Sequence, residues 1–275
     1  MSFKNFVPFA LAEKINTELE KDLVFAENCN REYEGKAKEI GDTVKILNAG
    51  KPTITTYADG KLHGLEDPEE LQGSSILMPL LHVAQINFGV DDLDKAQAAG
   101  NLYSTYMAEA KEGIADEMDA FIASMAADKR AVKETMSENL SKDNVLNVLD
   151  AQLVRLLENN VKRNQEISVT ASPKFCNILR QAYRDLDTNN HELLQNGKVG
   201  RYNTMTIKES NNVYKDNTYE YIQIKTNRAL AFVKPYIHLE PYRVEKHFKD
   251  AVKGYALYDG TIVRPKEMIV LKVKY

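Results

Sequence analysis

The strongest constraint on the fold of this chain is the contrast between two consecutive segments. Residues 33–73 are charged, rich in turn signals and poor in large apolar side chains, whereas residues 93–125 follow one uninterrupted helical pattern. A segment with so little apolar content cannot hold itself in place by burying its own surface. It needs a surface outside the subunit to receive it, so we expect a protein whose partner is a second copy of itself.

The polar segment is predicted to contain two strands, residues 43–47 and residues 53–57, joined by Asn48-Ala-Gly-Lys-Pro52. Asp59-Gly60 marks a further tight turn, and residues 60–73 show no periodicity and are predicted to form a loop.

Residues 82–88 then alternate in polarity and place Ala84, Ile86 and Phe88 on one face. This alternation predicts a half-buried strand that returns to the body of the subunit.

The long helical pattern is predicted to span about residues 92–127. At roughly 1.5 Å rise per residue, about 34 residues give a rod on the order of 50 Å. Its apolar side chains step by three or four residues, as one helix face requires. They are Tyr103, Tyr106, Ala110, Ile114, Met118, Phe121 and Met125. This rod is expected to be the structural spine of the subunit.

An amphipathic helix is predicted near the start of the chain, over residues 7–26. Its apolar positions are Leu11, Ile15, Leu19, Leu23 and Val24. The spacing fits a core helix, and it fits a surface arm that packs on a neighbouring subunit at least as well, because the helix stands alone before a polar segment.

The second half of the chain mixes helices and strands. The stripe Val145, Val148, Leu149, Leu153, Leu156 and Leu157 predicts a second helix. Ser172-Pro173 predicts the start of a third, because Ser caps well and Pro suits the first helical position. Strands are predicted at residues 167–170, 204–207, 219–225, 229–236, 254–258, 261–263 and 268–273. Asp259-Gly260 is interpreted as a two-residue hairpin turn, and the fold class is α+β without a linker between independent domains.

Composition argues against several classes of protein. Lys+Arg number 36 and Asp+Glu 40, so the net charge of −4 leaves no overall basic footprint for nucleic-acid binding. The apolar runs fall far short of the about 18 residues that a membrane span needs, and the N-terminus does not read as a signal peptide. Cys29 and Cys176 are too few for a disulfide framework or a zinc site, and we expect reduced thiols.

No catalytic constellation stands out. The histidines His63, His82, His191, His238 and His247 are scattered, without a nucleophile elbow or a metal-binding spacing. No metal or cofactor is therefore expected. A distant alternative is an enzyme that uses carboxylates such as Glu109 and Asp116, which are seven residues apart and share a helix face.

Four segments, in this order, resemble the major capsid proteins of tailed bacteriophages, which have the Hong Kong 97-type fold (P22 coat-like branch). Asn30-Arg-Glu-Tyr-Glu-Gly35 with residues 41–46 resembles the start of that family's extended loop, and residues 88–97 resemble the strand that leads into its spine helix. Residues 196–203 resemble a turn and strand of its axial domain, and residues 248–265 resemble its C-terminal strands. Thr204 departs from the pattern, because many relatives carry Gly there.

The resemblance implies a shell subunit with five parts. They are an N-terminal arm (residues 1–32), an extended loop (33–80), a peripheral domain with the spine helix (81–144), an axial domain (145–231) and C-terminal strands (232–275). Pentamers and hexamers would form an icosahedral shell around double-stranded DNA, in a virion made in the bacterial host cytoplasm. The assembly positions are Leu11, Ile15 and Leu19 in the arm and Lys36, Lys38, Lys45, Lys51 and Lys61 in the loop.

The expected partners are copies of the chain itself, a separate scaffolding protein, a portal and an optional decoration protein. Packaged DNA would be held without sequence-specific binding, and no membrane is involved. An encapsulin-like nanocompartment shell protein, which shares this fold, is the alternative.

Overall fold

The computed structural model describes residues 23–34, 39, 41–48, 54, 56, 58–59, 61, 74–91, 102–185, 200–244 and 249–275. The strands are β1 (Thr43–Asn48), β2 (Ser74–Pro79), β3 (His82–Asp91), β4 (Val132–Thr135), β5 (Ile167–Ala171), β6 (Arg201–Tyr202), β7 (Met205–Glu209), β8 (Glu220–Thr226), β9 (Leu230–Arg243), β10 (Lys249–Ile262) and β11 (Met268–Val273). The helices are α3 (Leu102–Ser124), α4 (Val145–Glu158) and α5 (Pro173–Asp185), with short 3-10 turns η3 (Met125–Ala127) and η4 (Pro265–Glu267). This mixture of helix and sheet confirms the α+β class.

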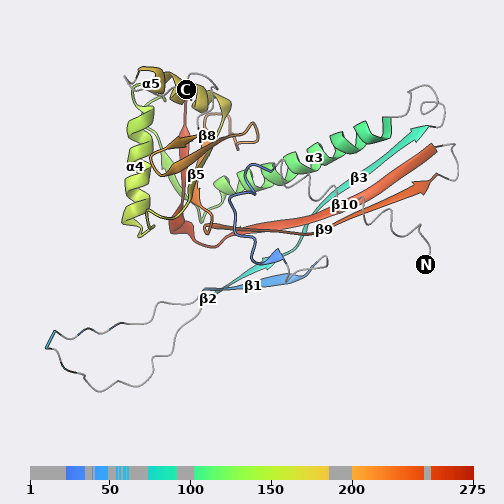
Figure 1. Cartoon of the computed structure of the whole chain (residues 1–275), viewed down its shortest axis with the longest axis horizontal. Helices are drawn as coiled ribbons and strands as arrows, with labels where there is room; N and C mark the ends of the chain where they lie inside the picture. The colour runs from blue at the N-terminus through green and yellow to red at the C-terminus, as the bar shows by residue number, and fades with distance from the viewer. Residues whose placement is uncertain are drawn as a thin grey trace.

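One end of the molecule is a long wing that consists of β3, β9, β10 and α3 (Figure 1). β10 is the central strand and pairs antiparallel with both β3 and β9. The predicted half-buried strand is confirmed, because Ala84, Ile86 and Phe88 pack against the main core while Gln85 and Asn87 are exposed. Helix α3 runs alongside these strands (Figure 1).

The spine helix α3 buries only part of its predicted stripe. Ile114 and Met118 are buried, and Phe121 is half-buried against the same core. Tyr106 remains 47% exposed, with its ring 6.1 Å from that of Phe88. Met125 follows the helix in η3, where the regular α-helix has ended. Residues 92–101, which the helical pattern also covered, lie outside the described residues.

The other end is a six-stranded sheet in the order β4-β11-β8-β5-β7-β6, with α4 and α5 packed beside it (Figure 1). Every residue of the two middle strands, β8 and β5, is buried. The predicted helix start is confirmed, since Ser172 Oγ accepts a hydrogen bond from the Phe175 amide at 3.3 Å and Pro173 is the first residue of α5.

A buried carboxylate ties the last residue of the sequence to this sheet. Tyr275 donates its hydroxyl to Glu220 Oε2 at 2.7 Å, and Ser172 donates to the same oxygen. Lys215 Nζ lies 3.0 Å from Glu220 Oε1. Burial alone would raise the pKa of Glu220, but the hydrogen bonds from Ser172, Tyr275 and Lys215 outweigh it and lower the pKa below its ordinary value.

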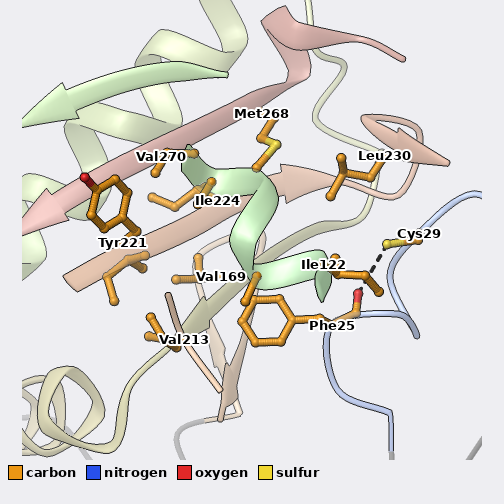
Figure 2. Packing of buried hydrophobic residues seen from close by; sticks show 14 of the residues in the cluster. Phe25, Cys29, Ile122, Val169, Val213, Tyr221, Ile224, Leu230, Met268 and Val270 are labelled. Carbon is orange, nitrogen blue, oxygen red and sulfur yellow. Dashed lines mark hydrogen bonds between the residues drawn. The ribbon is translucent and has the colours of Figure 1, made fainter. Parts of the chain in front are cut away.

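Residues 23–30, which we call the strap, cross the core between the wing and the six-stranded sheet. Leu23, Phe25, Ala26 and Cys29 are buried, and Figure 2 shows Phe25 and Cys29 among side chains of both sheets. Residues 23–26 are bent rather than helical, which corrects the helix predicted over residues 7–26 at its C-terminal end. Burial of these side chains against distant strands overrides the helical spacing here.

Polar anchors from three elements hold the strap. Asp119 of α3 accepts hydrogen bonds from the Val24 amide at 2.8 Å and the Phe25 amide at 3.2 Å. Burial raises the pKa of Asp119 above its ordinary value, and these backbone hydrogen bonds oppose the shift. Lys225 of β8, fully buried, donates to the Asn28 carbonyl at 2.6 Å. The Asn30 amide donates to the Leu230 carbonyl of β9 at 2.8 Å.

The hairpin turn predicted at Asp259-Gly260 is wrong, because both residues lie inside the continuous strand β10. Asp259 pairs with Val233 and Gly260 with Phe232, and the register shifts between Leu257 and Asp259. Two steps along β10, from Leu257 to Asp259, oppose three along β9, from Tyr236 to Val233, so the irregularity is an extra residue in β9 and not a reversal of the chain.

We expect Phe25→Ala to lower the free energy of unfolding by about 3–5 kcal/mol, because the cavity would lie inside the main core. Chemical unfolding of the unassembled subunit measures this loss. Tyr106→Ala is the control and should cost no more than about 1 kcal/mol, since that ring is half exposed. Equal effects of the two variants would mean that the strap is a detachable arm.

Replacement of Glu220 by Gln should destabilise the subunit by about 1–3 kcal/mol at neutral pH, because charge-assisted hydrogen bonds are lost. The folded-state pKa of Glu220 is lowered, so its stabilisation is present above the ordinary carboxyl pKa and is lost as the pH falls through the folded value. The difference in melting temperature from wild type should therefore shrink in acid. The exposed Glu138→Gln control should show no such pH-dependent difference.

Candidate assembly surface

The best candidate for an interaction surface is the two-stranded sheet β1–β2, which we call the ribbon. Its strands pair antiparallel, with Thr43 opposite Pro79 and Asn48 opposite Ser74. The partner strand of β1 is therefore β2, and of the predicted strand 53–57 only Ile54 and Thr56, which are not in a strand, lie among the described residues. Two strands alone are marginal in water, so the ribbon depends on the surface that supports it.

One face of the ribbon packs on the body of the subunit. Its buried side chains are Val44, Ile46, Met78 and Leu80, which lie against Ala231, Val233, Leu257 and Val263. The body residues come from β9, β10 and the segment that follows β10. This contact places the ribbon below the wing strands in Figure 1.

The opposite face of the ribbon is exposed and carries two leucines beside Thr43, Lys45 and Ser75. Leu47 is 73% exposed and Leu77 62%, and Leu81, just after β2, is 63% exposed. Leu47 lies opposite Ser75, and Leu77 lies opposite Lys45, so the two leucines are diagonal neighbours on one face. We call Leu47 and Leu77 the apolar face. Exposed leucines on a ribbon that buries its other face are typical of a surface that another protein covers.

The root of the ribbon is fixed by backbone hydrogen bonds. The Gly41 amide donates to the Leu80 carbonyl at 3.0 Å, and the Leu80 amide donates to the Asp42 carbonyl at 2.8 Å. Gly41 has φ +88°, a conformation that residues with a Cβ rarely adopt. These bonds join the two segments at the root of the ribbon to each other and extend the pairing of β1 with β2.

Asp259 of β10, beside the register shift with β9, ties this root to the wing. Its Oδ2 accepts the Leu81 amide at 3.0 Å and lies 3.0 Å from His82 Nδ1, while its Oδ1 accepts the Gly260 amide at 2.7 Å. The His82 ring packs on Phe121 of α3 with a centroid distance of 4.3 Å. A single buried carboxylate thus joins the ribbon, β3 and β10.

The structure describes some of the predicted assembly residues. Lys45 lies exposed in β1, on the same side of the ribbon as the apolar face, and Lys61 is exposed. The remaining predicted positions, Leu11, Ile15, Leu19, Lys36, Lys38 and Lys51, lie outside the described residues. Of the predicted spine, Tyr103 lies in α3.

Sequence reasoning missed the exposed leucines of the ribbon. Residues 76–81 read Ile-Leu-Met-Pro-Leu-Leu, so apolar side chains occupy both faces of one strand. In a strand, neighbouring side chains point to opposite faces, so such a run has to be covered on both sides. This run of apolar residues could have predicted a strand that is covered on both faces.

The distant enzyme alternative gains no geometric support. Glu109 is exposed on α3, and Asp116 accepts a hydrogen bond from Asn212 Nδ2 at 2.9 Å at the surface. Within the described ranges, no group of three or more histidine, cysteine, aspartate or glutamate residues is placed to hold a metal ion. No helix of the described part of the chain has the length and hydropathy to cross a membrane.

Solved structures with the same architecture come from phage particles. A chain from Mycobacterium phage Che8 is 27% identical, with a TM-score of 0.76 over 90% of this chain and 90% of that chain. A chain from the capsid structure of cyanophage P-SCSP1u is 14% identical, with a TM-score of 0.68 over 86% of this chain and 84% of that chain. The chain therefore resembles phage capsid proteins in fold over nearly its whole length, as the sequence motifs predicted.

A virus-like particle from Pyrococcus furiosus also shares the fold. Its chain is 14% identical, with a TM-score of 0.60 over 95% of this chain and 97% of that chain. No family model matches the sequence, and no curated protein matches it.

We expect Asp259→Asn to loosen the root of the ribbon, because an amide side chain replaces one acceptor oxygen by a donor. Hydrogen exchange of the Leu81 amide should accelerate about fivefold or more, the effect of losing about 1 kcal/mol. Mass spectrometry of the unassembled subunit measures this rate. The Val169 amide in the buried strand β5 serves as the internal control, and unchanged exchange at Leu81 would show that Asp259 does not hold the ribbon.

Proposed function

We propose that this chain, which has the fold of phage capsid shell proteins, is the major capsid protein of a tailed bacteriophage. Copies of the chain would form pentamers and hexamers that close into an icosahedral shell around double-stranded DNA. The single observation that carries this proposal beyond the fold is the uncovered apolar face of the ribbon. A rigidly rooted ribbon with one apolar side in solvent is suited to lie on a neighbouring copy.

The proposed parts of the subunit follow the fold. Residues 33–80 would form the extended loop that contains the ribbon, residues 81–144 the peripheral domain and residues 145–231 the axial domain. The C-terminal strands, residues 232–275, would return to the wing and the six-stranded sheet. The arm proposed for residues 1–32 divides into the strap, which is built into the subunit, and an earlier part that carries Leu11, Ile15 and Leu19 for contact with a neighbour.

The proposed role toward DNA is containment. A net charge of −4 gives the whole chain no excess of basic residues with which to bind phosphates tightly. Weak binding suits a shell that is filled by a motor, because strong binding to the wall would oppose packaging. A scaffolding protein, a portal and a decoration protein are the proposed partners, and the virion is the proposed location. In this role the chain acts as a structural protein and not as an enzyme.

The second candidate function is an encapsulin-like compartment that packages proteins instead of DNA. The shared fold with the virus-like particle from Pyrococcus furiosus is the observation that favours it. Both candidates require the chain to assemble into a closed shell. The genes beside this one distinguish them, since a terminase or portal gene indicates a phage and a cargo enzyme gene indicates a compartment.

The experiment that tests the proposal compares wild type with the double variant L47Q/L77Q. Wild-type protein, with its scaffold if one is required, should form closed particles above a steep concentration threshold, because many weak contacts close together. The double variant should fold normally, since both side chains are exposed, and should fail to close shells at that threshold. Electron microscopy and sedimentation measure the particles, and thermal unfolding measures the fold.

Val154→Gln is the matched control, because Val154 is 53% exposed and lies in α4, outside the ribbon. It removes a similar exposed apolar side chain and should leave the threshold near that of wild type. A double variant that closes shells as well as wild type would show that the apolar face is not an assembly contact. Wild-type protein that stays monomeric or dimeric at high concentration would overturn the shell function itself.

A further inference from the structure

A recess lies beside the end of the ribbon, between three segments that are distant in the sequence. Its volume is about 430 Å³. The strap and the residues after it contribute Arg31 and Glu32, the β8–β9 turn contributes Arg228, and the segment after β10 contributes Arg264. We call this cavity the arginine recess. Leu47, the first residue of the apolar face, also lines it.

Three guanidinium groups line the arginine recess, and Glu32 is the only carboxylate among its described lining residues. Arg31 Nε lies 3.1 Å from Glu34 Oε1, and Arg264 Nη1 lies 2.9 Å from Glu267 Oε1. These pairs offset the charges of Arg31 and Arg264, so Arg228 is the guanidinium that favours an anion here.

Arg228 differs from the other two arginines, because it is exposed and no salt bridge to it is found among the described residues. A guanidinium carries five donors in a planar fork that matches a carboxylate with two parallel hydrogen bonds. The recess is therefore shaped and charged to accept acidic side chains, and its apolar lining at Leu47 and Val263 can accept aliphatic ones.

The chain itself contains a segment with this chemistry. Residues 65–71 read Leu-Glu-Asp-Pro-Glu-Glu-Leu, and no Lys or Arg occurs from residue 62 to residue 94. Four carboxylates flanked by two leucines complement Arg228 and the apolar lining at Leu47 and Val263.

Continuity with the apolar face identifies the source of the segment. Leu47 belongs to both the apolar face and the arginine recess, so a neighbour seated on that face extends directly to the recess. We propose that the arginine recess binds the acidic segment 65–71 of a second copy of this chain. This inference rests on the proposed shell function and names the residues through which one copy recognises the next.

The test uses the full chain with two changes of charge, one substitution in the recess and three in the segment. Arg228→Glu alters the recess, and E66K/E69K/E70K alters the segment. Each variant alone should raise the threshold concentration for assembly about fivefold or more, which corresponds to about 1 kcal/mol per subunit for one lost ion-pair contact. Lys129→Glu is the control, since it reverses an exposed charge at the start of the segment before β4, and it should leave the threshold unchanged.

Mixing the two variants decides between a neighbour's segment and the chain's own. In an equal mixture, the acidic segment of the Arg228→Glu variant can bind the intact recess of the segment variant. The basic segment of that variant can bind the recess that carries Arg228→Glu. The threshold should then fall below that of either variant alone. If each segment instead filled the recess of its own chain, the mixture would assemble no better than its components, and the proposed second copy would be wrong.

The remaining outcomes also decide the inference. If wild type assembles and Arg228→Glu leaves the threshold unchanged, the proposed role of the recess is wrong while the shell function stands. A raised threshold for Arg228→Glu alone, with a normal threshold for the segment variant, would show that the recess binds a different partner. Thermal unfolding of each variant, with a melting temperature near that of wild type, establishes that the threshold reports contact between copies and not the fold.

Discussion

Lys225 carries an ammonium group into the centre of the subunit, where an uncompensated charge would be prohibitively costly. The strap compensates it, because the carbonyls of Phe25 and Asn28 and the sulfur of Cys29 surround Lys225 Nζ at 3.3, 2.6 and 3.0 Å. The same few residues are held by Asp119 of α3 and pair with β9. The placement of the wing relative to the six-stranded sheet thus depends on a short piece of chain that belongs to neither.

The ribbon depends on a different principle, the two-residue period of a strand. Val44 and Ile46 face the body while Lys45 and Leu47 face solvent, so each strand serves the subunit with one side and is available to a neighbour with the other. Asp259 fixes the ribbon relative to the wing, because it binds the first residues after β2 to β10. Because the root is fixed in this way, the apolar face stays exposed to a neighbouring copy and does not fold back onto its own subunit.

The sequence predicted those elements whose pattern is local. The stripe of α4, the Ser172-Pro173 start of α5 and the alternation of β3 each depend on neighbours within a few residues, and each is confirmed. The predictions that failed depend on distant partners. β1 pairs with β2, which lies well beyond the turn signals that follow β1, and Asp259-Gly260 lies inside β10 because both residues pair with β9. The candidate surface was predictable as a region, whereas its exposed leucines required knowledge of which face the body covers.

Because Asp259 lies within β10, that strand connects the ribbon rigidly to the wing. Its first part is hydrogen-bonded between β3 and β9 in the wing, and Asp259 near its end accepts a hydrogen bond from the root of the ribbon. A strand paired on both sides resists bending, so a force applied to the ribbon by a neighbour turns the wing with it. A shell made of such subunits would change its curvature by tilting whole subunits about their contacts, and the local angle between neighbours would be set where the ribbon meets the next copy.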